Sequence, residues 1–190
     1  MESPKTLSDT EASMLIKALI TPRNRLLGLL LLDAGLRIGE AVQLRKTDLL
    51  FNTKAYESLY LPPEYCKRCH GRTIPLSNRL QEAIEFIQET RWSLPYYENS
   101  PWALWSNARL EPLKVRQARN IINSAGIKAI GRSVNPHMLR HTFATRLMRV
   151  TNIRTVQELL GHTNLSSTQI YTHPGPADLK SAIDKIEHVG

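Results

Sequence analysis

The chain has 190 residues, with 25 lysines and arginines against 17 aspartates and glutamates, which gives a formal net charge of +8. This length suits one domain with its own hydrophobic core and leaves no room for a second full domain. A composition of 42% hydrophobic residues excludes extensive disorder. The excess positive charge favours a polyanionic partner, although basic charge alone does not identify one.

The N-terminal residues and the cysteines indicate the cellular compartment. Residues 1–11 are polar and form no secretion leader, and the longest apolar run, residues 26–32, is too short to span a bilayer. We therefore expect a cytoplasmic protein with no membrane partner. Cys66 and Cys69 are the two cysteines, and a reducing compartment disfavours a disulfide between them.

Two helices are predicted at the start of the chain. Ser8 and Glu11 form a capping-box pattern, so a helix should begin after Ser8. A second helix is expected over residues 22–34, with proline in its first turn and Gly35 as a left-handed stop. Because this second helix is apolar on most sides, we expect it to be buried.

A small sheet is predicted in the middle of the chain. The runs 55–61 and 72–76 have a β-like pattern and are separated by proline and glycine turns, which predicts one small antiparallel sheet. Asn78 is expected to cap the helix that follows. Residues 92–112 contain all three tryptophans and three prolines and predict an irregular segment.

The second half of the chain is predicted to be helical. The pattern favours helices over residues 114–125, 136–149, 153–160 and 178–187, and Gly161 should stop the third of these. The expected fold class is therefore mainly α with a small antiparallel β-sheet.

One of these helices carries a group of basic side chains. His137, Arg140 and His141 lie at positions i, i+3 and i+4, so they share one face of the helix, which should line a cleft or meet solvent. Leu139 and Phe143 should lie on its buried side. Basic helix faces are often simply solvated, so a functional interpretation depends on residues elsewhere.

Residues in two distant segments resemble the signature of one protein family. Downstream, Leu-Leu-Gly-His ends at His162, and Tyr171 follows nine residues later. Together with His137-x-x-Arg140, this pattern resembles the carboxy-terminal signature of the tyrosine recombinases, or phage integrases. Upstream, the segment Gly-Leu-Arg-x-x-Glu around Arg37 resembles the other part of that signature. The resemblance covers nearly the whole chain.

The resemblance implies a site-specific recombinase that cleaves and rejoins DNA without a cofactor, in integration, excision or resolution. Tyr171 would be the nucleophile, forming a 3′-phosphotyrosyl bond and releasing a 5′ hydroxyl. Arg37 and Arg140 would bind the phosphate oxygens, since a guanidinium is always charged and donates paired hydrogen bonds. His137 and His162 would supply hydrogen bonds and proton transfer.

Further residues are given supporting roles by the same resemblance. Glu40 and His141 would support the site. In this family a lysine of a β-hairpin protonates the leaving 5′ oxygen. Lys67, shortly before the run 72–76, is the candidate and would also contact DNA. The turn departs from the family pattern, so Lys54 stays an alternative.

The turn also contains Cys-x-x-Cys-His, which ends at His70 and formally matches haem attachment or half of a zinc site. Haem attachment would require export, and zinc would require two more ligands at suitable spacing. We therefore interpret Cys66 and Cys69 as incidental and predict no metal.

The domain organisation and assembly are also expected from the resemblance. Residues 1–190 would form one catalytic domain, without the N-terminal core-binding domain that family members usually carry. Residues 174–190 would form a tail helix. This tail would link protomers that are monomeric in solution into a homotetramer on double-stranded DNA; its packing on its own domain is the alternative.

Two other functions are compatible with parts of the pattern. A type IB topoisomerase shares the chemistry, but the spacing from His162 to Tyr171 argues against it. A non-enzymatic DNA-binding regulator on an inactivated recombinase fold is the other, and the complete catalytic set argues against that.

Overall fold

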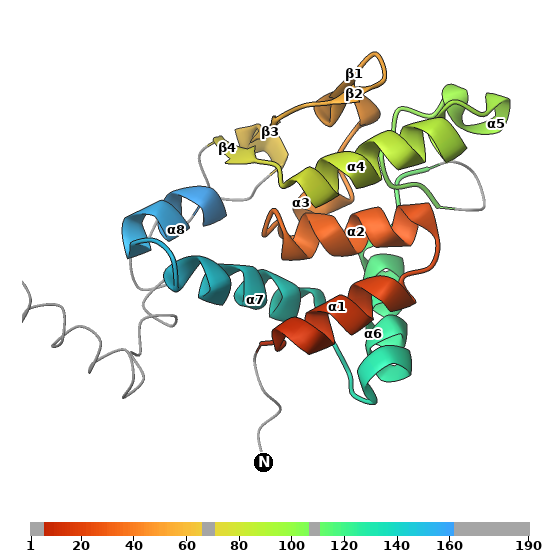
Figure 1. Cartoon of the computed structure of the whole chain (residues 1–190). Helices are drawn as coiled ribbons and strands as arrows, with labels where there is room; N and C mark the ends of the chain where they lie inside the picture. Colours follow the sequence, from red (N-terminus) through yellow and green to blue (C-terminus); the bar gives the residue numbers. More distant parts are fainter. Residues whose placement is uncertain (1–5, 66–70, 107–110, 162–190) are drawn as a thin grey trace, which may run out of the picture.

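The computed structural model describes residues 6–65, 71–106 and 111–161 of the protein, and most of them lie in helices (Figure 1). The α-helices are α1 (Asp9–Ala18), α2 (Pro22–Leu32), α3 (Ile38–Ala41), α4 (Asn78–Ile87), α5 (Pro95–Glu98), α6 (Val115–Ile130), α7 (Pro136–Met148) and α8 (Ile153–Leu160). The strands are β1 (Leu50–Phe51), β2 (Lys54–Ala55), β3 (Ser58–Leu61) and β4 (Arg72–Pro75). Shorter helical turns are η1 (Lys46–Asp48), η2 (Pro63–Tyr65) and η3 (Gln88–Trp92). The mainly helical fold class with antiparallel strands is confirmed.

The first helix begins where the capping box predicts. The Ser8 amide donates to the Glu11 carboxylate (2.8 Å), and the Glu11 amide donates to the Ser8 hydroxyl (3.2 Å). Glu11 also accepts a hydrogen bond from the Arg132 guanidinium (2.9 Å), which lies just after α6. The cap therefore also attaches α1 to α6, against which it packs.

Helix α2 forms the centre of the hydrophobic core. Every residue from 26 to 32 is buried, as predicted, and the helix packs against α1, α4 and α7. It ends at Leu32, two residues before the predicted end at Ala34, and Gly35 then adopts the predicted left-handed conformation (φ +62°). The chain therefore turns sharply just before Arg37.

The prediction of a single sheet was wrong, because the strands form two separate antiparallel pairs, β1–β2 and β3–β4. The run 55–61 is divided between them: Ala55 pairs with Leu50, whereas Ser58 pairs with Pro75. The chain thus changes partner strand within a run whose side-chain pattern is continuous, and such a pattern does not specify the partner.

The prediction that Asn78 caps helix α4 was wrong, because Ser77 is the capping residue. The Ser77 hydroxyl accepts from the Leu80 amide (3.3 Å), and Asn78 is the first helical residue. Serine and asparagine are both good N-cap residues, so the sequence alone did not show which of these two neighbours caps the helix. Beyond α4, the predicted irregular segment begins at the last residue of η3 and includes α5, and its expected buried piece, residues 103–105, is in the core.

Helix α6 extends to Ile130, five residues beyond the predicted end at Ala125. The additional turn passes through Gly126, which is packed so closely that a Cβ there would lie 2.5 Å from a methyl carbon of Val134. This packing outweighs the unfavourable helix propensity of glycine. Gly131, with φ +69°, ends the helix.

Helices α7 and α8 have nearly the predicted bounds. Asn135 caps α7 by accepting from the Met138 amide (3.0 Å), and Gly161, with φ +64°, ends α8 as predicted. Helix α8 packs against α7 and β4 (Figure 1). No helix within the described ranges is long and apolar enough to cross a membrane. The helix predicted over residues 178–187 lies outside the described residues.

Candidate active site

Arg37 lies at the N-terminus of the short helix α3, immediately after the turn that follows α2. Its amide donates to Oε2 of Glu40 (2.7 Å), and its Nη1 donates to Oε1 of the same carboxylate (3.0 Å). The Arg37 side chain is 40% exposed, whereas Glu40 is buried. The backbone of Arg37 is therefore fixed against the core while its guanidinium reaches solvent.

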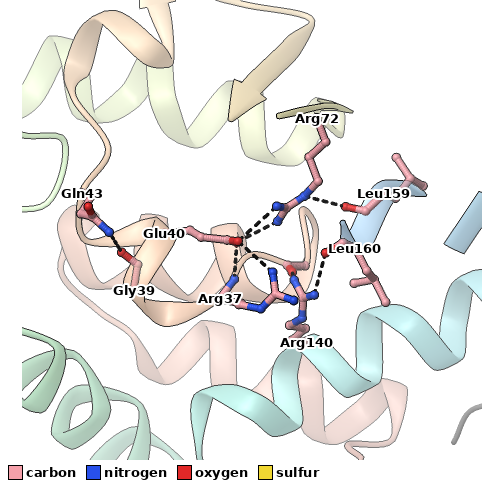
Figure 2. A network of polar contacts seen from close by, with 9 residues as sticks. Arg37, Gly39, Glu40, Gln43, Arg72, Arg140, Leu159 and Leu160 are labelled. Carbon is pink, nitrogen blue, oxygen red and sulfur yellow. Dashed lines mark hydrogen bonds and ion pairs between the residues drawn. The ribbon is translucent and has the colours of Figure 1, made fainter. Parts of the chain in front are cut away.

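Glu40 is also bound by a second arginine, Arg72, the first residue of β4 (Figure 2). Nη1 and Nη2 of Arg72 donate to the two carboxylate oxygens at 3.1 and 2.7 Å, in a paired geometry. Burial by itself would raise the pKa of Glu40, but the hydrogen bonds and charge of Arg72, the Arg37 amide and the charge of Arg140 lower it. Glu40 is therefore ionised, and together Arg37, Glu40 and Arg72 carry one net positive charge.

Arg140 is the deepest of the cationic residues, with 2% of its surface exposed. Its Nη1 donates to the carbonyl of Gly35 (2.5 Å) and its Nη2 to the carbonyl of Leu160 (2.8 Å). These acceptors belong to the turn before Arg37 and to the end of α8, so Arg140 joins both to α7 (Figure 2). Helical spacing correctly indicated a cleft on this side of α7 but did not reveal how deeply Arg140 is buried.

His137 and His141 lie side by side on α7, one turn apart. Their ring centroids are 4.2 Å apart and the rings meet edge to face. Partial burial and the positive charges of Arg140 and Arg37 lower the pKa of His137. The neutral imidazole is thus the favoured form of His137 at neutral pH, and it can accept a proton or a hydrogen bond.

Arg37, His137 and Arg140 line one cleft of about 760 Å³. The rest of its wall comes largely from α6 and the segment before α7, with polar residues Arg119, Asn120, Asn123, Ser133 and Asn135. Lys54, the alternative general acid, is not among the lining residues; it lies on β2, where its ammonium pairs with Glu85 at 3.5 Å. The cleft is thus cationic and polar, which suits a phosphate-bearing ligand.

Comparison with known proteins identifies the family. Residues 5–177 match the model of the phage integrase family. The chain belongs to this family. It is 36% identical over 185 residues to the tyrosine recombinase XerA of Pyrococcus horikoshii, which covers 96% of this chain and 61% of the relative. The resemblance inferred from the two sequence segments is confirmed.

Solved structures of family members have the same fold. The crystal structure of XerA recombinase superposes with a TM-score of 0.79 at 28% identity, over 97% of this chain and 64% of that one. XerH site-specific recombinase bound to difH substrate gives 0.66 at 28% identity, over 95% and 53%. The chain thus spans between 53% and 64% of the length of these relatives.

Several residues that the family signature singles out lie outside the described residues, namely Lys67, His162 and Tyr171, and Cys66 and Cys69 lie outside them too. Within the described ranges, no three histidine, cysteine or acidic side chains group as metal ligands. Of the residues that the sequence predicts for the site, the structure describes Arg37, Glu40, His137, Arg140 and His141, and Arg37, His137 and Arg140 line the cleft.

Sequence reasoning missed two contributors to this region. Arg72 was considered only as the start of a strand, and its partners, Glu40 and the carbonyl of Leu159, follow from no local pattern. Arg119, on α6, was not considered at all. The available signal for Arg119 was the polar stripe that it forms with Asn120 and Asn123 on one side of α6.

Proposed function

We propose that this chain is the catalytic domain of a tyrosine-type site-specific recombinase that cleaves and rejoins double-stranded DNA in integration, excision or resolution. The observation that carries this proposal is the meeting of Arg37 with His137 and Arg140 at one cleft, although Arg37 is distant from the other two in the sequence. The resemblance to XerH, which was solved bound to its difH substrate, supports DNA as the ligand.

The cationic residues would stabilise the reacting phosphate. As the nucleophile approaches phosphorus, negative charge builds on the non-bridging oxygens, and fixed cations stabilise that charge without rearranging. Arg37 reaches the cleft from the α2–α3 turn, and Arg140 lines it from α7. No metal is needed for this chemistry, because the guanidinium groups supply the positive charge.

Tyr171 would perform the covalent step. Its phenolic oxygen attacks phosphorus and gives up its proton, the bond from phosphorus to the 5′ oxygen breaks, and a 3′-phosphotyrosyl bond forms. His137, favoured in its neutral form, and His162 would donate hydrogen bonds and move protons. A 5′ hydroxyl of the partner duplex reverses the reaction, which completes strand exchange and restores Tyr171.

Lys67 would protonate the leaving 5′ oxygen. It belongs to the segment between β3 and β4, and the first residue of β4, Arg72, binds Glu40 directly. The start of β4 is thus attached to the residue that holds Arg37. Lys54 belongs to the other strand pair and is engaged by Glu85, so Lys67 is the better candidate.

Assembly on DNA would use the C-terminal tail. We propose that monomers in solution form a homotetramer on DNA, with residues 174–190 packing on a neighbouring protomer. Sedimentation of the chain with and without its DNA substrate tests this: deletion of residues 174–190 should abolish the large complex. A tetramer that survives the deletion would contradict it.

The cleavage activity is tested by trapping the covalent intermediate. The chain is incubated with a pool of short nicked duplexes of randomised sequence, in which the cleaved fragment diffuses away, and protein–DNA adducts are separated under denaturing conditions. The native chain should give an adduct, whose sequence identifies the site, and Tyr171→Phe should give none. No adduct from the native chain, or an adduct from Tyr171→Phe, would overturn the proposal.

A further inference from the structure

Arg72 joins three elements that surround the cationic cleft. It starts β4, its Nη1 and Nη2 bind the carboxylate of Glu40 on α3, and its Nε donates to the carbonyl of Leu159 near the end of α8 (3.0 Å). Figure 2 shows the guanidinium between the two acceptors. All three kinds of guanidinium nitrogen are thus engaged, in an environment from which water is largely excluded.

The end of α8 is held by two arginines at once. Arg72 binds the carbonyl of Leu159, and Arg140 binds the carbonyl of Leu160. The last carbonyls of a helix have no partner within the helix and carry partial negative charge, so cations are favourable there. Two fixed cations on successive carbonyls therefore hold the last turn of α8 in place.

The contact with Gly161 shows how closely Arg72 fits. A Cβ at this position would lie 2.9 Å from Nη1 and 3.0 Å from Cδ of Arg72, so only glycine leaves room for the guanidinium. Gly161 also has φ +64°, which independently favours glycine. The turn after α8 is therefore shaped around Arg72.

The charge of Arg72 also changes how Glu40 acts on Arg37. The Glu40 carboxylate accepts hydrogen bonds from both arginines. A buried carboxylate that loses one cation relies more heavily on the other, because leaving it unpaired is costly. Without Arg72, Glu40 would hold Arg37 more tightly and cancel more of its positive charge.

We propose that Arg72 is a positioning residue for the cleavage step. It takes up much of the charge of Glu40, so that Arg37 can act on the phosphate, and it fixes the end of α8 relative to α3 and β4. This inference rests on the proposed DNA cleavage. It assigns Arg72 an effect on the transition state, transmitted through Arg37, in addition to any effect on folding.

The test compares two substrates that differ in charge at the reacting phosphate. One is the duplex identified by trapping; the other carries a methylphosphonate at the scissile position, where a methyl group replaces one non-bridging oxygen. The uncharged centre develops less negative charge in the transition state and needs Arg37 less. The rate of adduct formation in a single turnover is measured for both, together with the Kd for DNA and the thermal unfolding of each variant.

Arg72→Met should slow cleavage of the natural phosphate by roughly 100-fold, the scale of losing one fixed donor in an active site, with little change in Kd. On the methylphosphonate the defect should shrink by about 10-fold, because the lost effect acts through Arg37. Arg72→Lys, which keeps the charge but not the forked geometry, should recover part of the rate. Arg79→Met is the matched control: it removes another paired arginine–carboxylate contact, to Asp33, outside the cleft, and should cleave like the native chain.

An equal loss on both substrates would show that Arg72 only supports folding and would overturn the proposal, as would a native rate for Arg72→Met. If Arg72→Met does not fold, Arg72→Lys decides by the same comparison of substrates. Every result is a ratio to the native chain, so failure of this inference leaves native cleavage intact, whereas failure of the proposed function removes the native adduct itself.

Discussion

The charge on His137 is set by its surroundings. Partial burial lowers the pKa of the imidazole, and the positive charges of Arg140 and Arg37 lower it further, so a third positive charge is disfavoured there. The neutral ring and the two arginines are thus consistent with one another. The two arginines supply permanent positive charge, and His137 supplies a group that can exchange a proton near neutral pH.

This arrangement predicts the titration of His137. Its pKa, followed by NMR of the ring protons, should lie below the ordinary value of about 6.5. Arg37→Gln should raise it, because removing a positive neighbour favours the protonated form. His137→Gln assigns the resonance, since its signal should disappear. A pKa at or above the ordinary value, or a downward shift in Arg37→Gln, would contradict the prediction.

Local sequence patterns indicated side chains on one helix face but not what those side chains bind. Arg140 was correctly placed beside His137, because helical spacing determines their shared face. Its acceptors are backbone carbonyls of Gly35 and Leu160, and a carbonyl is present at every residue whatever its type. The same holds for Arg72, whose partner Glu40 lies 32 residues earlier. Long-range hydrogen bonds of this kind require the fold itself.

Two glycines with left-handed backbone conformations follow the helices that lead to the site. Gly35 follows α2 and lies against the ring of Phe143, and Gly161 follows α8 and lies against Arg72. The first turn presents the carbonyl of Gly35 to Arg140, and the second packs Gly161 against the guanidinium of Arg72. The ends of these helices therefore contribute as much to the site as their faces do.

Alanine at either glycine should destabilise the protein. Gly35→Ala and Gly161→Ala each impose a strained φ and a steric clash, and each should lower the free energy of unfolding by roughly 1–3 kcal/mol. Gly39→Ala is the control, since no atom lies within 4 Å of its added Cβ. It should change stability by less than about 0.5 kcal/mol. Urea unfolding measures all three; a cost for Gly161→Ala no larger than that for Gly39→Ala would refute the packing argument.

The helices were more predictable than the strands. Caps and stops such as Ser8 and Gly161 act within one turn, so the sequence nearby determines them. The run 55–61 was read as one strand because its partner changes without any break in the pattern. The end of α6 was predicted at Ala125 because glycine follows it. Close packing of Gly126 against Val134 keeps that glycine helical, and the pattern around Gly126 does not reveal this contact. Tertiary packing decided both cases.

At the scale of the whole molecule, the effect of a positive charge on ligand binding depends on whether it lies at the cleft. The sequence has a net charge of +8, but only some of its cations line the cleft. Arg119 on α6 belongs to the cleft, whereas Arg91 on η3 does not. The net charge predicted the class of ligand, and the fold determines which residues meet it.

This difference predicts a salt effect on DNA binding. Arg119→Gln should weaken binding and reduce the slope of log K against log salt by about one, as expected when one phosphate contact is lost. Arg91→Gln removes the same charge elsewhere and should leave the slope nearly unchanged. The slopes are measured by fluorescence anisotropy with a labelled duplex over a range of salt concentrations. Equal reductions in both variants would show that only total charge matters.

The carbonyls at the end of α8 also have a consequence for biosynthesis. Arg37, Arg72 and Arg140 all leave the ribosome before Leu160 does, because the chain is made from its N-terminus. Until α8 has emerged, Arg72 has only Glu40 as an acceptor and Arg140 has only the carbonyl of Gly35, so each lacks its acceptor on α8. The growing chain therefore carries its cationic side chains without their final geometry, and their order is completed by the last turn of a helix that contributes only backbone oxygens to them.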